Sequence, residues 1–357
     1  MKKILIGSFL LIIITCLSAQ EMHPYRLIHA DTLTVDKIRD EYVTRLRGNV
    51  HFFYGETEFF TDFAEVFEKQ KITRMVGNVQ VFEDTLSLYA NKGEYLRLRD
   101  MLILEGDVFI QEDHYDGTIR TFRADRVDYL REHGQIDAYD NIEMYDQREE
   151  LFCTSGLLHY RMEDEYGYLL QRPVLTALEK DSLQVSAEKI EYFHGFEKVV
   201  ATFDVRTETK DFTMTSDFLL YFADEEKAIY LGEPQFTSDF ANANAVEFRI
   251  FFDEEKIKQA QLQDECYMEF ATIEGAPKDS WVTGEYMEFD FEDGAVRLYR
   301  AYGNIDSYFF QDKFYHDDFL INSAVGDTLI VNVSADNEIE AIRLFHKVKG
   351  KYQFEKR

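Results

Sequence analysis

A degenerate repeat of about thirty residues constrains the fold of this chain more than any other feature. The first half of each copy is a tripeptide of Gly or Asp, then Asn or Asp, then Val or Ile, and the first copies follow one another at steps of 29, 29 and 34 residues. The clear copies are Gly48-Asn49-Val50, Gly77-Asn78-Val79, Gly106-Asp107-Val108, Asp140-Asn141-Ile142 and Gly303-Asn304-Ile305. Weaker copies fit near Arg172, Phe203, Gly232 and Asp264, which gives about nine units. A fixed period of this length predicts one supersecondary unit stacked many times.

The second half of the repeat is a small residue and a polar residue, followed by an apolar residue and, two positions further on, an aromatic one. Copies occur at Ala124 to Tyr129, Ser155 to Tyr160, Ala187 to Tyr192, Ser216 to Tyr221 and Asn244 to Phe248. Around both halves, apolar and charged residues alternate in short runs bounded by Gly, Asn or Asp, a pattern typical of antiparallel strands. We therefore expect an elongated all-β domain with at least about eighteen strands, two for each unit, and less than about a tenth helix.

The N-terminus has the pattern of a secretory signal peptide. Met1-Lys2-Lys3 is followed by an apolar run and by Ser18-Ala19, which fits a small-residue cleavage site. We expect residues 1–19 to be the signal peptide and 20–357 to form one elongated repeat domain; two tandem halves, 25–170 and 171–357, are the alternative division. Cys16 leaves lipidation open as a second interpretation. The mature chain is expected in the periplasm, with outer-membrane association as a further option.

The chain is strongly acidic, with a formal net charge of −29 that becomes −31 without the first nineteen residues. This charge argues against nucleic acid, which requires a basic surface, and against docking on an anionic membrane. The acidic runs at Asp224 to Glu226 and Asp253 to Glu255 are expected to be solvated hairpin turns. No HExxH, CxxC, GxSxG or nucleotide-binding loop is present, so we expect no catalytic residue, cofactor or metal site.

Two cysteines remain after processing, Cys153 and Cys266. They fall in the fourth and eighth units, so several strand spacings of about 4.8 Å separate them, beyond the reach of a disulfide. Two free, packed thiols are expected.

The ordered repetition of these two half-motifs after a signal peptide resembles the OstA-like family, the LptA-type periplasmic lipopolysaccharide-transport proteins. The copy at Gly106-Asp107-Val108 with Ala124 to Tyr129 is the nearest to the family pattern, and the resemblance is strongest from Leu46 to Tyr160. It implies an open antiparallel β-jellyroll, similar to a β-solenoid, whose apolar interior shelters the acyl chains of lipopolysaccharide. It also implies head-to-tail stacking on further OstA-fold components or on itself, without enzymatic activity. The chain departs from the family in its length and its acidity.

Alternation places the apolar side chains of each short run, such as Val50 and Phe52, on one shared inner face, and over the successive units these positions form a trough. A packed core and a lipid-binding trough both fit this pattern, and the expected function is lipid binding in lipopolysaccharide transport to the outer membrane. An exported β-helix that binds or degrades polysaccharide is the alternative. The candidate trough residues are Val50, Phe52, Val79, Val81, Val108, Ile110, Val127, Tyr129, Ile142, Ile190 and Tyr192.

Overall fold

The computed structural model describes residues 25–178, 183–194, 197–253, 256–272, 276–292, 295–311, 319–334 and 339–355. The expected signal peptide, Cys16, Glu254, Glu255, Lys356 and Arg357 lie outside the described residues.

The described residues form 26 strands and a single three-residue 3₁₀ helix, η1 (Arg131–His133). The prediction of an all-β chain with very little helix is thereby confirmed. The strands are β1 (Tyr25–His29), β2 (Thr32–Ile38), β3 (Glu41–Tyr54), β4 (Thr57–Phe67), β5 (Ile72–Glu83), β6 (Leu86–Leu96), β7 (Met101–Asp113), β8 (Ile119–Leu130), β9 (Gln135–Asp146), β10 (Leu151–Arg161), β11 (Tyr166–Leu170), β12 (Val174–Ala177), β13 (Gln184–Ser186), β14 (Lys189–Phe193), β15 (Lys198–Glu208), β16 (Phe212–Phe222), β17 (Lys227–Leu231), β18 (Gln235–Ser238), β19 (Ala241–Asn244), β20 (Glu247–Asp253), β21 (Lys256–Phe270), β22 (Ser280–Glu292), β23 (Ala295–Gln311), β24 (Phe319–Val333), β25 (Ile339–Phe345) and β26 (Lys349–Glu355).

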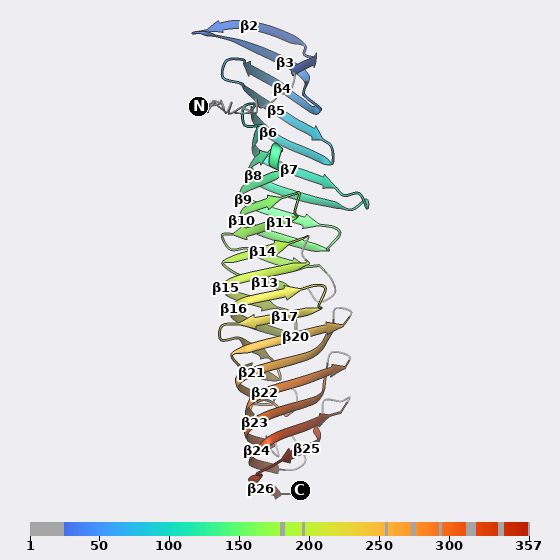
Figure 1. Cartoon of the computed structure of the whole chain (residues 1–357), viewed down its shortest axis with the longest axis vertical. Helices are drawn as coiled ribbons and strands as arrows, with labels where there is room; N and C mark the ends of the chain where they lie inside the picture. The colour runs from blue at the N-terminus through green and yellow to red at the C-terminus, as the bar shows by residue number, and fades with distance from the viewer. Residues whose placement is uncertain are drawn as a thin grey trace, which may run out of the picture.

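All described strands belong to one antiparallel sheet in which long strands pair with their neighbours in sequence, as β3 does with β4 and β4 with β5. The strands stack along the long axis of the molecule, with β2 at one end and β26 at the other (Figure 1). The acidic run Asp224 to Glu226 lies in the turn between β16 and β17, as expected. The result is an elongated, repetitive β-jellyroll of the predicted type.

Each long strand bends near its middle, so the sheet has two walls that face each other across the interior. We call the wall that contains Glu41–Arg47 wall A and the wall that contains Val50–Tyr54 wall B. The bend is seen directly at β10, whose Leu157–Arg161 pairs with β11 while its Leu151–Thr154 pairs with the separate strand β12. Rings from the two walls meet inside, since the Phe59 ring of wall B lies 5.6 Å from the Tyr95 ring of wall A.

The first half of the repeat forms the bend. At each clear copy two consecutive residues have positive φ, for example Gly77 at 82° and Asn78 at 48°, and the strand register shifts between Val76 and Val79. Such a pair of left-handed residues turns the chain sharply, and glycine adopts this conformation without steric strain. The weaker copies have the same geometry, at Gln171-Arg172, Phe203-Asp204, Gly232-Glu233 and Asp264-Glu265. The expected positions of the repeat are therefore confirmed, and a tenth pair, His346-Lys347, joins β25 to β26.

Candidate functional site: the apolar interior

The two halves of the repeat meet at the corners between the walls. The Asn141 side chain donates from Nδ2 to Asp125 Oδ2 at 2.8 Å, and Asn78 donates to Asp62 at the same distance. Asp125 is the polar residue of a second half-motif, so it pairs with the first half-motif of the next unit. Equivalent bonds join Asn49 to Asp31, Asn304 to Glu285 and, with the roles reversed, Asn91 to Asp107. This corner ladder fixes the angle between the walls in one unit after another.

The corner glycines leave room for these acidic side chains. A Cβ at Gly77 would lie 2.5 Å from Asp62 Oδ2, and one at Gly232 would lie 2.5 Å from the Asp217 Cβ. Glycine is therefore favoured there by close approach as well as by positive φ, although other copies have Asp140 or Phe203 at the same position.

All eleven candidate trough residues face the interior and are at most 4% exposed. Seven lie on wall B and four, Val127, Tyr129, Ile190 and Tyr192, lie on wall A. All belong to one hydrophobic cluster that runs from Leu46 to Val331. Their inward position follows from the alternation in the sequence, whereas their role in lipid binding stays a prediction.

The interior also contains residues that sequence reasoning missed. Phe59, opposite Phe52 and Val81 in the strand register, is fully buried, and its ring stacks on the Phe52 ring at 5.0 Å. Leu88, Leu104 and Leu158 are likewise fully buried. Alternation of apolar and polar residues along their strands is the signal that could have identified them, and Leu158 is also the apolar residue of the half-motif at Ser155 to Tyr160. Residues directly opposite one another in a sheet share a face.

Opposite the corners, hairpin turns of wall A approach those of wall B along an edge that we call the seam. Arg131, in η1 on wall A, donates from Nε and Nη2 to the two carboxylate oxygens of Glu83 on wall B, both at 2.8 Å. It also bonds Asp100 Oδ1 at 2.7 Å and Thr57 Oγ1. Closer to the N-terminus, Tyr54 on wall B shares a 2.7 Å hydrogen bond with Thr73 on wall A. Polar contacts thus close the seam over these units.

A buried ionic cluster crosses the interior between the third and fourth units. Arg120 on wall B is fully buried, donates from Nε to Asp146 Oδ2 at 2.7 Å, and contacts the hydroxyl of Tyr160 on wall A. Burial raises the pKa of the neighbouring Glu112 carboxyl, and Arg120 partly offsets this shift. Sequence reasoning missed the cluster, although Arg120 is in the same alternation phase as the inward Phe122.

Hydrogen bonds between the two walls continue into the next units. Further towards the C-terminus the interior is less tightly covered. Tyr192 lies 3.8 Å from Met144 Sδ, and the Tyr230 hydroxyl lies 3.1 Å from Thr207 Oγ1. From β20 onwards, several inward apolar side chains are only partly buried. They include Phe252, Ile257, Phe270, Phe291, Val296, Val333, Ile339 and Leu344.

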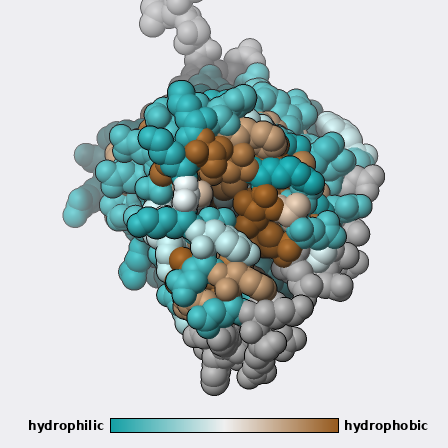
Figure 2. Space-filling view, turned by 90° about the horizontal axis from the view of Figure 1, so that it is seen from below, coloured by the Kyte–Doolittle hydropathy of each residue, from teal (hydrophilic) through white to brown (hydrophobic). Residues whose placement is uncertain are grey.

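The interior is uncovered at the C-terminal end. Ile342 and Leu344 of β25 pair with the buried Val331 and Leu329, so they face inward, yet Ile342 is 39% exposed. Tyr352 and Phe354 of β26 are also exposed. Apolar residues gather in the middle of this end and polar residues surround them (Figure 2). At the opposite end, the inward Leu33 and Val35 of β2 are 51% and 55% exposed.

Both remaining cysteines, Cys153 and Cys266, are buried free thiols, as expected. Within the described ranges, no group of three or more His, Cys, Asp or Glu side chains is arranged to hold a metal ion. Nor does any helix of the described chain have the length and apolarity needed to span a membrane.

Comparison with known proteins supports the predicted resemblance over the N-terminal units. Residues 24–136 match the family model described as OstA-like protein. A search of curated protein sequences found no match. Among solved structures, the chain is similar to the crystal structure of LptH, the LptA homologous periplasmic component of the conserved lipopolysaccharide transport device from Pseudomonas aeruginosa. That similarity has 12% identity and a TM-score of 0.26, and it covers 39% of this chain and 76% of the other.

Proposed function

We propose, from the premise that residues 24–136 are OstA-like in sequence, that this protein is a non-enzymatic periplasmic component of lipopolysaccharide transport. In this proposal the interior between the walls shelters the acyl chains while the ligand passes towards the outer membrane. The signal peptide expected at residues 1–19 would export the chain.

The observation that carries the proposal is the apolar interior that runs along the stacked strands and is uncovered at both ends. Its buried stretch extends from Leu46 to Val331. Transfer of acyl chains from water to the uncovered part of this interior is favourable by about 0.8 kcal/mol for each buried methylene and needs no specific polar partner. The less tightly covered units beyond β20 are the part of the interior that we expect to receive the ligand first.

We also propose that the protein stacks head to tail with OstA-fold partners or with itself. β1 and β2 form one terminal edge of the described sheet, and β25 and β26 form the other. An exposed edge offers backbone N–H and C=O groups to another strand, and a contact between two different edges extends without closing. The uncovered side chains of Leu33 and Ile342 would then meet an apolar neighbour instead of water.

Site-specific photo-crosslinking on β25 tests the lipid proposal. A photoreactive amino acid at Ile342 or Leu344 faces the interior, whereas one at the intervening Arg343 faces outward, where Arg343 bonds Asn332 Oδ1. These positions are preferable to Val79 or Val127, which are 1% exposed and would be disrupted by a larger side chain.

With purified lipopolysaccharide as the probe, the inward positions should form the crosslinked adduct, and Arg343 should form at most about a tenth as much. Equal labelling at the three positions, or no adduct at any of them, would contradict the proposal. Turnover of polysaccharide by the purified chain would favour the degrading alternative instead.

A further inference from the structure

The outer face of wall A carries two adjoining depressions that the transport proposal leaves unused. The first has a volume of about 410 Å³ and is lined by His159, Arg161, Asp164, Tyr166, Phe193 and His194. The second, of about 350 Å³, shares Phe193 and His194 with the first and continues to Lys198 and Phe222. Each volume lies in the range of about 300–1,000 Å³ that is usual for small-molecule sites. Because the depressions share residues, they form one elongated site, which we call the wall A groove.

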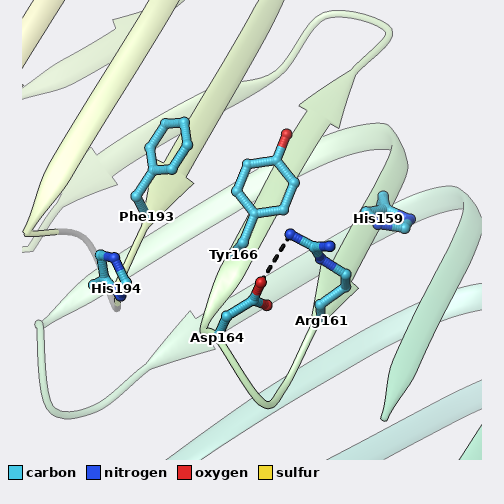
Figure 3. Close-up of a pocket in the computed structure, with 6 residues that line it drawn as sticks. All are labelled: His159, Arg161, Asp164, Tyr166, Phe193 and His194. Carbon is cyan, nitrogen blue, oxygen red and sulfur yellow. Dashed lines mark ion pairs between the residues drawn. The ribbon is translucent and has the colours of Figure 1, made fainter. Parts of the chain in front are cut away.

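The floor of the groove is aromatic. Tyr166 and Phe193 alternate with the buried Gly167 and Tyr192, so both rings point away from the interior. Their ring centroids are 5.1 Å apart, and the Tyr166 ring lies between Phe193 and Arg161 (Figure 3). Behind it, His159 stacks on Tyr168 at 4.8 Å. Such rings present a flat surface of weak negative potential to the C–H groups of a ligand.

Donors and acceptors alternate along the rim. Arg161 Nη2 lies 2.8 Å from Asp164 Oδ2, and both side chains are 46% exposed, so each keeps hydrogen-bonding capacity towards solvent. The Tyr166 hydroxyl donates to Glu191 Oε1 at 2.8 Å, and burial together with this bond raises the pKa of Tyr166 to about 12. The hydroxyl therefore stays protonated at neutral pH.

The charges along the groove disfavour an anionic ligand. Four carboxylates oppose two fixed cations among the lining residues, which repels phosphate or sulfate. Arg161 lies 4.9 Å from the Tyr166 centroid and Lys198 lies 5.2 Å from the Phe193 centroid, so each ring already has a cation partner. The charged lining residues are Arg161, Lys198, Asp164, Glu197, Asp224 and Glu225.

We propose that the wall A groove binds a neutral saccharide chain. To reach the Tyr166 and Phe193 rings, a sugar displaces the long Arg161 and Lys198 side chains that lie over them, and its apolar C–H face then packs on the rings. Its neighbouring hydroxyls both donate and accept, as the Arg161–Asp164 rim requires. The two joined depressions take consecutive sugar units. This inference concerns the outer face of wall A and is independent of lipid binding in the interior between the walls.

Titration of the intact mature protein with neutral oligosaccharides tests the proposal. Maltohexaose, cellohexaose and chitohexaose are the probes, with an oligosaccharide of dextran sulfate as the anionic comparison, and binding is followed by saturation-transfer NMR and calorimetry. At least one neutral probe should bind with a Kd of about 1 mM or tighter. Phe193→Ala should weaken that binding at least about tenfold, and Arg161→Gln should weaken it by a smaller factor.

Phe60→Ala is the matched control. Phe60 is a half-buried, outward-facing phenylalanine on wall B, where it stacks on His51 at 4.3 Å, so its loss should change saccharide affinity by less than about twofold. Three results would overturn the proposal: no neutral probe binds, the sulfated probe binds more tightly, or Phe60→Ala weakens binding as much as Phe193→Ala. If Phe193→Ala does not fold, Arg161→Gln and Lys198→Gln provide the comparison. The crosslinks at Ile342 and Leu344 do not involve this face, so either proposal can fail alone.

Discussion

Asn141 and Asp125 are bonded across neighbouring strands, and this bond joins the two half-motifs that define the repeat. The donor is in β9 and the acceptor is in β8, with 2.8 Å between Asn141 Nδ2 and Asp125 Oδ2. The two half-motifs that recur in the sequence are therefore in direct contact between consecutive units.

A double-mutant cycle on Asn141→Ala and Asp125→Ala measures what this contact contributes. We expect a coupling free energy of about 0.5–1.5 kcal/mol in urea denaturation, because a solvent-accessible hydrogen bond is worth about that much. Asn78→Ala combined with Asp125→Ala is the control, since Asn78 bonds Asp62 instead, and its coupling should be near zero. Equal coupling free energies in the two cycles would show that the Asn141–Asp125 bond makes no specific contribution to stability.

Gly77→Ala should destabilise the protein more than Gly117→Ala. Both glycines have positive φ, 82° and 88°, but a Cβ at Gly77 would meet Asp62 while one at Gly117 would have nothing within 4 Å. We expect about 1–2 kcal/mol from backbone strain at either site and at least about 1 kcal/mol more at Gly77. Thermal unfolding measures the difference, and Asp62→Ala in the Gly77→Ala background should recover part of the extra loss, because it removes the carboxylate contact but keeps the Asp62 Cβ position at 3.1 Å and loses the bond to Asn78. No recovery would mean that the close approach is unimportant.

Arg131→Ala should open the seam. Its side chain is 6% exposed and joins Glu83 to Asp100, so its removal leaves two partly buried carboxylates without their cation, a loss of about 3–5 kcal/mol. Arg126→Ala is the control, because Arg126 is 43% exposed and its ion pairs should contribute less than about 1 kcal/mol. Hydrogen exchange should also rise in β5 and β8. Similar losses for the two variants would refute a special role of the seam.

The buried thiols should resist alkylation in the folded protein. Burial raises the pKa of Cys153, and that of Cys266, from 9.0 to about 12, so the folded state favours the protonated thiol. The stability that each contributes is fully present below about pH 9 and is lost as the pH rises towards 12. At pH 8 we expect iodoacetamide to react at least about a hundredfold more slowly than with the unfolded chain, as read by mass spectrometry. Rapid labelling of native protein would contradict the burial, and Cys153→Ala assigns the remaining signal to Cys266.

Deletion of residues 346–357 removes β26 and should abolish concentration-dependent association if the C-terminal edge stacks on a partner. Analytical ultracentrifugation of the mature chain measures this. Lys349→Gln with Lys351→Gln is the control, because it keeps the strand and removes two exposed charges. Unchanged association of the deletion variant, with more nonspecific aggregation, would show that the basic strand only protects the edge.

The sequence predicted the features that depend on local periodicity. Alternation placed Phe52 and Ile190 inside, and spacing located the bend at Phe203 although no glycine is present there. It did not predict the seam contacts or the Arg120 cluster. Several of those contacts join side chains far apart in the sequence, 26 residues for Arg120 to Asp146 and 74 residues for Arg131 to Thr57. Their formation depends on how the two walls close, which no local pattern encodes. The wall A groove was missed for the same reason.

Because each unit repeats one pair of left-handed residues at its bend, the cross-section is set within a unit and the length is set by the number of units. Removal of one whole unit, for example residues 77–105, should shorten the molecule by two strand spacings, about 10 Å, and leave both walls in register. Evolution can thus change the reach of such a protein by duplicating or deleting one segment of sequence, without redesigning the interior.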